Sequence, residues 1–154
     1  MAILKFMDLI RSQGLDPDLV AAFVMQESSG NPNATRYEPR FYARYIAPMK
    51  LKDQDEATGR ATSWGLMQLM GQVAREHGFT GEFKSLLEPS LGLKWGCGKL
   101  SECLKRYPRD LDSAIAAYNA GTARKNKEGE FVNQGYVDSV KKYLLEFRKD
   151  VGNV

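Results

Sequence analysis

The sequence contains one histidine and two cysteines in 154 residues. Because His77 stands alone, no histidine and cysteine cluster of the kind that binds zinc is present, and a core or helix-cap role is expected for it. Cys97 and Cys103 are six residues apart in a helical pattern, which separates them by about 9 Å along the helix axis. No phosphate-binding glycine loop is seen. The sequence therefore predicts no metal site, no disulfide and no cofactor.

Long hydrophobic runs and a strong charge of one sign are also missing. No stretch approaches the roughly 20 apolar residues that cross a bilayer. Lys5 and Asp8 interrupt the apolar N-terminal segment, which lacks a small-residue cleavage site and is interpreted as a mature helix rather than a signal peptide. The net charge is only +3, with scattered Lys and Arg, which argues against nucleic acid as a partner. The composition, 43% hydrophobic and 27% charged, predicts one globular domain over residues 1–154.

Helical spacing of apolar residues recurs along the chain. It predicts helices over residues 3–13, 17–29, 64–77 with Ser63 as N-cap, 91–107 with Ser90 as N-cap, 112–120 and 136–149. No run of alternating strand residues is evident, so a mainly α fold is expected. Residues 35–62 show no clear period and are expected to be irregular, apart from a short helix near residues 41–46.

Glu27 continues the apolar face of the second predicted helix. Leu19, Val20, Phe23 and Val24 form that face, and Glu27 follows Phe23 by one helical turn. Burial and the negative end of the helix dipole both favour the protonated form of a carboxyl group here. A carboxyl group that stays protonated near neutral pH can act as the general acid of glycosidic bond cleavage. The alternative is a glutamate that reaches solvent at a helix end.

Three short segments resemble the signature segments of the lysozyme-like lytic transglycosylase domain, which soluble lytic transglycosylases typify and goose-type lysozymes partly share. They are QESSGNPNA at residues 26–34, SWGLMQLM at 63–70 and AYNAG at 117–121, in the family's order. A fourth segment, LLEPSLGLKWG at 86–96, resembles the family's L-x-D-P-x-x-N-I-x-x-G. The resemblance extends from about Asp16 to Tyr143.

The resemblance implies a lysozyme-like single domain of about six to eight helices with a substrate cleft. Its implied substrate is the glycan strand of peptidoglycan. The implied roles are Glu27 as the single catalytic acid, Gln68 and Met70 as glycan contacts, Tyr118 as the tyrosine near the acid, Asn119 as its structural neighbour, and Tyr136 as the tyrosine that opens the last helix. Ser63 and Glu38 complete the candidate substrate-binding residues.

The sequence also departs from the family pattern. Gly30 stands where an aromatic residue is usual, and Arg36 where a serine is usual. Val132 replaces a glutamate that helps to hold glycan, which leaves that role vacant or moves it to Glu130 or Asn133. About 22 extra residues precede the Gly-Leu-Met-Gln segment, and an insert of this length is expected to be a binding loop or a lid.

The insert interleaves aromatic residues with arginines in RYEPRFYARY, residues 36–45. Aromatic rings that stack on sugars and arginines that bind carboxylates would suit a peptidoglycan strand with acidic peptide stems. An aromatic half-core beneath a loop is an equally good interpretation. Glu38 is either a second carboxylate in the cleft or a partner that anchors Arg36 or Arg40.

The resemblance implies cleavage of the β-1,4 bond between N-acetylmuramic acid and N-acetylglucosamine, with Glu27 as acid and then base and a 1,6-anhydro end as product. Two alternatives stay open. One is a hydrolase in which Glu38, Asp53, Asp55 or Glu56 positions water, and the other is a non-catalytic glycan-binding module. We expect a monomer that acts in the cell envelope, in the periplasm or outside the cell, and that reaches its substrate from a trimmed precursor or by phage or secretion-system delivery.

Overall fold

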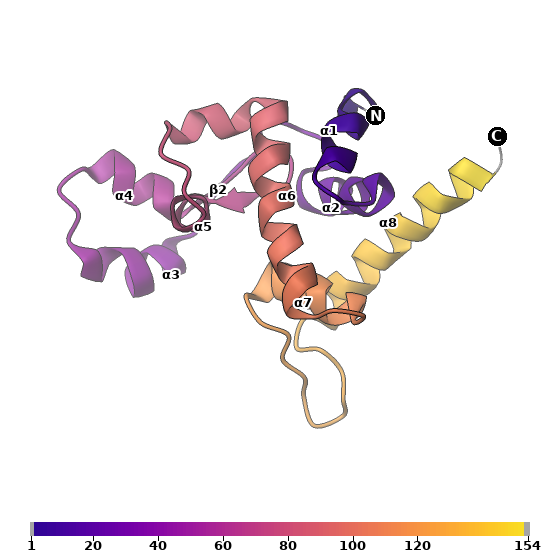
Figure 1. Cartoon of the computed structure of the whole chain (residues 1–154). Helices are drawn as coiled ribbons and strands as arrows, with labels where there is room; N and C mark the ends of the chain where they lie inside the picture. The colour runs from indigo at the N-terminus through magenta and orange to yellow at the C-terminus, as the bar shows by residue number, and fades with distance from the viewer. Residues whose placement is uncertain (1, 153–154) are drawn as a thin grey trace. The chain divides into compact units, whose positions relative to one another are not determined.

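The computed structural model describes residues 2–152, which form a mainly helical fold with a small three-stranded sheet (Figure 1). The chain divides into two compact units. Unit 1 contains residues 1–26 and 97–154, and unit 2 contains residues 27–96. The two divisions fall inside helices α2 and α6, so each of these helices contributes residues to both units. None of the helices in residues 2–152 has the length and apolar content needed to cross a membrane.

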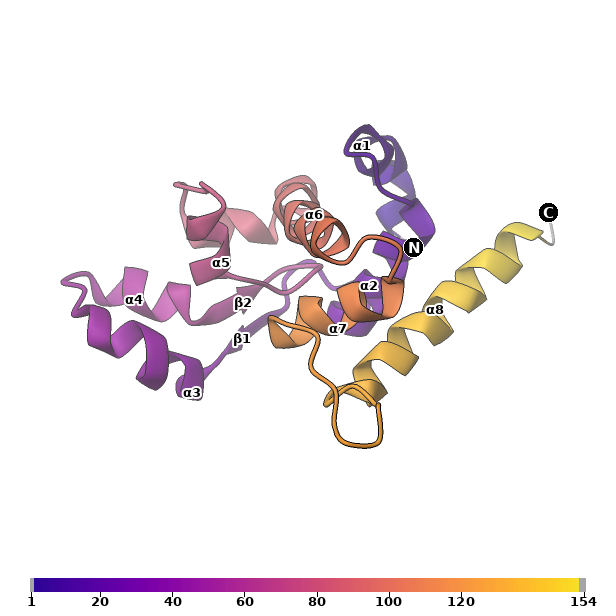
Figure 2. The same cartoon turned by 60° about the horizontal axis from the view of Figure 1, so that its bottom comes forward.

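Unit 1 is built from helices that the sequence predicts. They are a 3-10 turn η1 (Ala2–Phe6), α1 (Met7–Ser12), the larger part of α2 (Pro17–Ser28), the C-terminal part of α6 (Pro89–Arg106), α7 (Leu111–Ala120) and α8 (Gln134–Gly152). α8 packs on α7 near its start and its later turns extend past α7 in both views (Figure 2). The predicted helices of this unit are therefore present, although the first of them begins as a 3-10 turn.

The core of unit 1 includes buried apolar residues of α2, α7 and α8. Phe23, Ile115 and Val140 are each fully buried there. Asp110 caps α7 by accepting a hydrogen bond from the Ser113 amide at 3.1 Å. Cys97 and Cys103 are buried free thiols.

Unit 2 contains an antiparallel sheet in the order β1-β2-β3, formed by β1 (Thr35–Tyr37), β2 (Thr62–Trp64) and β3 (Leu69–Met70). The prediction of a helix that starts after Ser63 is therefore wrong, and only α5 (Gly71–Glu76) is helical in that stretch. Gly65 has φ +76° and Gln68 has φ +49°, so the turn between β2 and β3 leaves the helical region twice. A Cβ at Gly65 would lie 2.6 Å from the Leu86 carbonyl oxygen, which makes glycine necessary there.

The insert is regular, contrary to expectation. It contains β1, α3 (Pro39–Phe41), a π-helix η2 (Tyr42–Ile46), a 3-10 turn η3 (Ala47–Met49) and α4 (Gln54–Arg60). The short helix expected near residues 41–46 is present, in π form. Ile46, Ala57 and Ala61 make a small buried core, with Phe41, Tyr42 and Leu51 packed against it. The insert therefore includes the aromatic half-core that the sequence left open.

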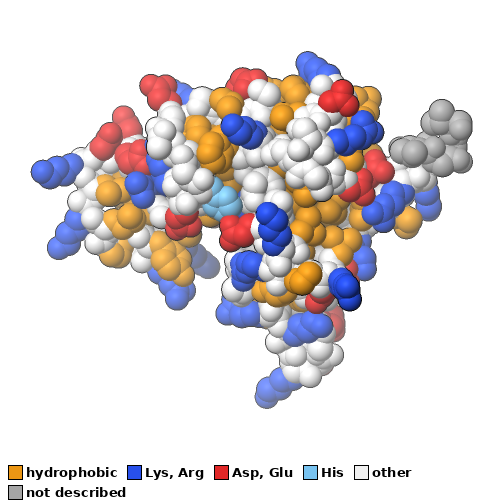
Figure 3. Space-filling model, in the orientation of Figure 1, with side chains coloured by type: hydrophobic (Ala, Val, Ile, Leu, Met, Phe, Trp, Pro, Cys, Tyr) orange, Lys and Arg blue, Asp and Glu red, His pale blue; other side chains and the backbone are white. Residues whose placement is uncertain are grey.

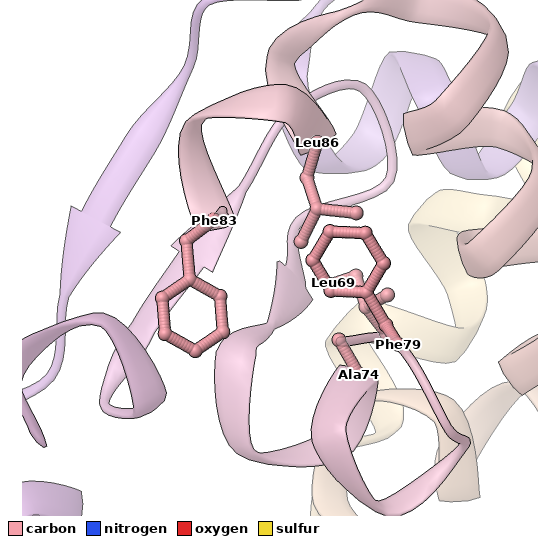
Figure 4. Packing of buried hydrophobic residues seen from close by; sticks show 5 residues of the cluster. All are labelled: Leu69, Ala74, Phe79, Phe83 and Leu86. Carbon is pink, nitrogen blue, oxygen red and sulfur yellow. The ribbon is translucent and has the colours of Figure 1, made fainter. Parts of the chain in front are cut away.

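The main apolar cluster of unit 2 joins β3, α5 and the 3-10 turn η4 (Phe83–Leu87). Its buried members are Leu69, Ala74, Phe79, Phe83 and Leu86, and Figure 4 shows Leu69, Ala74, Phe79 and Leu86 pointing toward one another. Trp64 stacks on Phe83 with ring centroids 5.8 Å apart. This cluster anchors the β2-β3 hairpin, which carries three of the candidate site residues.

The N-terminus of α6 closes unit 2. The Glu88 carboxylate accepts hydrogen bonds from the amides of Ser90 and Leu91, so Glu88 caps this helix and the prediction of Ser90 as N-cap is wrong. A Cβ at Gly92 would lie 2.7 Å from the Leu86 carbonyl oxygen, and one at Gly96 would lie 2.7 Å from the Met67 side chain. Both glycines allow a close approach, Gly92 to the 3-10 turn η4 and Gly96 to the β2-β3 turn.

Candidate active site

Glu27 is the penultimate residue of α2 and is half-buried. Phe23, one turn earlier on the same face, is fully buried. The chain reverses immediately after the helix, because Ser29 has φ +53° and Gly30 has φ +82°. The glycine in place of the family's aromatic residue therefore has a local cause, since a left-handed residue at this point favours glycine.

A side-chain hydrogen bond connects the end of α2 with the β2-β3 turn. The Ser28 hydroxyl donates to the Leu66 carbonyl oxygen at 2.8 Å. Ser28 follows Glu27 directly, and Leu66 lies two residues before Gln68. The segments QESSGNPNA and GLMQ, separate in sequence, are thus adjacent within unit 2.

Gln68 strengthens this connection with its side chain. Its Nε2 atom donates to the carbonyl oxygens of Ala34, at 3.0 Å, and Gly65, at 3.1 Å. Both partners are acceptors, which fixes the orientation of the amide and leaves Oε1 as its remaining acceptor. Gln68 lies in a turn rather than in the first turn of a helix.

Ser63 and Met70 face each other in the sheet, because β2 pairs with β3 through this residue pair. Ser63 also pairs with Arg36 of β1. Ser63 is buried and Met70 is half-buried. Ser63 is therefore a strand residue in the middle of the sheet, not a helix cap.

Glu38 takes the anchoring role that the sequence left open. Its Oε1 atom forms an ion pair with Arg36 Nε at 3.1 Å. Its amide donates to the Ala61 carbonyl oxygen at 2.8 Å, which fixes the start of α3.

Two of the candidate tyrosines contact a single ring in unit 1. The Tyr118 and Phe23 ring centroids are 4.7 Å apart, and those of Tyr136 and Phe23 are 6.5 Å apart. Tyr118 is only 2% exposed, and Lys99 Nζ lies 4.0 Å from its ring centroid. Tyr136 is half-buried. Both tyrosines thus pack against the residue one turn before Glu27 in α2.

Asn119 is exposed at the end of α7 and binds a second asparagine. Asn133 Nδ2 donates to Asn119 Oδ1 at 3.0 Å and to the Ala116 carbonyl oxygen at 3.1 Å. Asn133 Oδ1 is buried and has no hydrogen-bond partner among residues 2–152. Val132, at the position of the family's glutamate, is 56% exposed. Of Glu130 and Asn133, the two residues that could take over the role of that glutamate, Asn133 is the one that contacts a candidate residue, Asn119.

Sequence analysis missed a polar network between the insert and α5. Glu56 accepts from Arg60 Nε at 2.8 Å and from both arms of Arg75, at 2.9 and 2.8 Å. Chiefly through its hydrogen bonds with Arg75, the pKa of Glu56 is held below its ordinary value. Arg60 also donates to Gln72 Oε1 at 3.1 Å, and Gln72 donates to Glu76 Oε1 at 3.0 Å. The spacing of Gln72 and Glu76 by four residues was the available sequence signal.

Two grooves border this network in unit 2. The smaller, of about 330 Å³, is lined by Phe41, Tyr45, Gln72, Val73 and Glu76. The larger, of about 680 Å³, lies beside Trp64, Arg75 and Phe83. Within residues 2–152, no group of three or more histidine, cysteine, aspartate or glutamate side chains is arranged to hold a metal ion.

The charged side chains are mixed over the face seen in Figure 3, where Lys and Arg alternate with Asp and Glu. No continuous basic surface is visible on that face.

Two comparisons with known proteins bear on the site. The family model described as the transglycosylase SLT domain matches residues 7–136. A protein of Enterobacteria phage PRD1 named transglycosylase is 33% identical over 112 residues, which cover 73% of this chain and 32% of the phage protein. The chain thus spans about a third of the length of this relative. The matched residues 7–136 include every candidate site residue described above.

Proposed function

Because the chain belongs to the SLT transglycosylase domain family, we propose that it cleaves the glycan strands of peptidoglycan as a lytic transglycosylase, with Glu27 as the catalytic acid. The observation that carries the proposal is the position of Glu27. It is half-buried at the end of α2, next to Ser28, whose hydroxyl binds the turn that carries Gln68.

In the proposed reaction, a single carboxyl group acts first as the general acid and then as the general base. Glu27 donates its proton to the β-1,4 oxygen between N-acetylmuramic acid and N-acetylglucosamine, and the bond to the muramic C1 breaks. The acetamido group stabilises the positive charge that develops at C1. The Glu27 carboxylate then takes the proton of the muramic 6-hydroxyl as its oxygen bonds to C1. Glu27 ends protonated, and the product has a 1,6-anhydro end without addition of water.

The remaining candidates have binding roles in this proposal. The free Oε1 of Gln68 accepts a hydrogen bond from the glycan, and Met70 supplies an adaptable apolar contact. Ser63 in β2, Glu38 directly after β1, and the tyrosines Tyr118 and Tyr136 are proposed as further substrate contacts. Asn119 supports the end of α7. The site of action that follows is the cell envelope, where peptidoglycan lies.

Hydrolysis by the same fold is the alternative that needs a second carboxylate to position water. Three of the four acidic residues considered for this role are committed to other contacts, and Asp55 is the fourth. Asp53 caps α4, Glu56 is bound by two arginines, and Glu38 pairs with Arg36. These contacts favour the transglycosylase over the hydrolase.

Mass spectrometry of the muropeptides released from purified peptidoglycan tests the proposal. The wild-type protein is expected to release products one water lighter than hydrolytic products, and Glu27→Gln is expected to release none. Glu82→Gln, an exposed carboxylate in unit 2, is the matched control and is expected to behave as wild type. Reducing-end products would establish a hydrolase instead, and normal release by Glu27→Gln would exclude Glu27 as the acid. Glycan binding without any release would identify a binding module.

A further inference from the structure

The smaller groove of unit 2 is lined by two aromatic rings, those of Phe41 and Tyr45. The ring centroids of Phe41 and Tyr45 are 4.9 Å apart and their planes are tilted by 45°. Tyr45 is 51% exposed and lies in the π-helix η2. π-Helical turns are rare and occur often at functional sites, and an exposed aromatic ring in a groove is a typical ligand contact.

The polar residues that line the groove, Gln72 and Glu76, are oriented by hydrogen bonds. Gln72 receives a hydrogen bond from Arg60 on one side and donates one to Glu76 Oε1 on the other. Arg60 is itself held by the Glu56 carboxylate at 2.8 Å. This chain of contacts restrains the Glu76 carboxylate before any ligand arrives, and the second Glu76 oxygen is left to accept hydrogen bonds.

Only one of the side chains that line the groove is charged. Glu76 is the one carboxylate among the residues that line it. The guanidinium of Arg44 lies 5.2 Å from the Tyr45 ring centroid. A ligand with hydroxyl donors suits this carboxylate better than an anion would.

We propose that this groove, lined by Phe41, Tyr45, Gln72, Val73 and Glu76, binds one N-acetylhexosamine ring of a glycan strand and thereby holds the strand at the insert. A pyranose ring has an apolar C–H face that suits Tyr45 and Phe41, and hydroxyl groups at its edge that suit the Glu76 carboxylate. The volume of about 330 Å³ accommodates one such ring but no extended chain. The inference rests on the proposed function for the choice of a glycan as the ligand.

The test is a titration of each protein with a β-1,4-linked oligomer of N-acetylglucosamine, followed by NMR of the backbone amides and by calorimetry. Three forms are compared: wild type, Tyr45→Ala and Tyr37→Ala. Tyr37 is the matched control, because it is 46% exposed on β1 and does not line the groove. Thermal unfolding of both variants verifies that the fold is retained.

The expected result is a shift of the Gln72 and Glu76 amide signals in the wild-type protein. Tyr45→Ala is expected to bind the oligomer about fivefold more weakly, and Tyr37→Ala as the wild type does. Equal affinities for the two variants would overturn the proposal, and so would an absence of binding or of shifts at these amides in the wild type.

Muropeptide release, measured separately, distinguishes the two proposals. A wild-type protein that binds the oligomer at the groove but releases no muropeptides would contradict the proposed transglycosylase and leave the glycan subsite standing. A protein that releases anhydro products, with no effect of Tyr45→Ala on oligomer binding, would contradict only the subsite.

Discussion

Arg75 binds Glu56 through two parallel hydrogen bonds, from Nε to Oε2 at 2.9 Å and from Nη2 to Oε1 at 2.8 Å. The pair joins α5, which follows the candidate glycan-contacting hairpin, to α4 of the insert. Arg75 also lies over the Phe83 ring, with its guanidinium carbon 4.0 Å from the centroid. The insert is thus fixed to the rest of unit 2 by a geometry that only arginine provides.

Glu56→Gln is expected to lower the free energy of unfolding by about 2 kcal/mol, because it leaves two largely buried guanidinium groups without their charged acceptor. Urea unfolding followed by circular dichroism measures the change. Glu82→Gln, exposed in the same unit, is the control, with an expected change below about 0.5 kcal/mol. Equal effects of the two substitutions would show that the ion pair adds nothing to stability.

The same contacts predict a dependence of stability on pH. Hydrogen bonds with Arg75 lower the pKa of Glu56 in the folded protein. The stabilisation is therefore present above the pKa of an unfolded glutamate and is lost as the pH falls through the lower, folded-state pKa. Urea midpoints measured from pH 7 down to acid are expected to fall less steeply for Glu56→Gln than for wild type. Parallel curves would contradict this assignment.

Two glycines provide a matched pair of substitutions. A Cβ at Gly71 would lie 2.1 Å from the Gly59 carbonyl oxygen and 2.8 Å from the Phe83 ring, whereas a Cβ at Gly135 in α8 would have no neighbour within 4 Å. Gly71→Ala is expected to destabilise the protein by about 3 kcal/mol through overpacking. Gly135→Ala is expected to stabilise it by about 0.5 kcal/mol through helix propensity. Thermal unfolding of both variants checks the opposite signs.

The buried thiols predict slow chemical labelling. Burial raises the pKa of Cys97 to about 12 and also raises that of Cys103. Only the thiolate reacts, so a disulfide reagent at pH 8 is expected to modify both residues only at the rate of unfolding. Labelling in urea, which exposes both thiols, is the control. Fast modification of the native protein would contradict the burial of these thiols.

The helices could be predicted from the sequence where buried residues recur at the spacing of an α-helix. α2, α7 and α8 each bury a stripe at spacings of three and four residues, and their turn and cap residues lie beside them in the chain. The helix termini were harder to predict. Glu88 rather than Ser90 caps α6. The sequence did not distinguish the two residues, because both side chains can accept hydrogen bonds from the first amides of a helix.

The β2-β3 hairpin could not be predicted from spacing. Leu66, Leu69 and Val73 follow one another at helical intervals, yet Leu66 and Leu69 are buried by η4 and the α2 end rather than by one helix face. The deciding constraints are the left-handed residues Gly65 and Gln68, and neither is visible without the tertiary contacts that impose them. The same holds for the insert, whose small core of Ile46, Ala57 and Ala61 gathers residues from two helices and a turn.

The contacts of the candidate site residues were not predictable from motifs. The signature segments predict Gln68 as a glycan contact, but not that its Nε2 atom is bound to main-chain carbonyl oxygens. The Arg60, Gln72 and Glu76 chain has no motif, because its partners come from α4 and α5 at positions that only the fold brings together.

Substitutions of Gln68 distinguish its structural role in the hairpin from its proposed role in glycan binding. The substitution keeps the side-chain shape and the acceptor atoms, but it places a carboxylate oxygen about 3 Å from the carbonyl oxygens of Ala34 and Gly65, where the Nε2 donor now lies. The expected loss of unfolding free energy is about 2 kcal/mol. Gln68→Met, which retains the length but has no acceptor oxygen, is expected to destabilise less, since the carbonyls then face no charge.

For release of soluble muropeptides, both variants are expected to show a raised KM. Gln68→Glu repels the side chain from the two main-chain carbonyls and so displaces the acceptor oxygen, and Gln68→Met removes the Oε1 atom proposed to accept from the glycan. A Gln68→Glu protein with wild-type stability would contradict the observed amide orientation. The two hydrogen bonds from Nε2 to Ala34 and Gly65 stabilise the fold, so Oε1 is the atom of this side chain proposed to bind the substrate. A Gln68→Met protein with wild-type KM would therefore show that Gln68 stabilises the hairpin but does not bind the glycan.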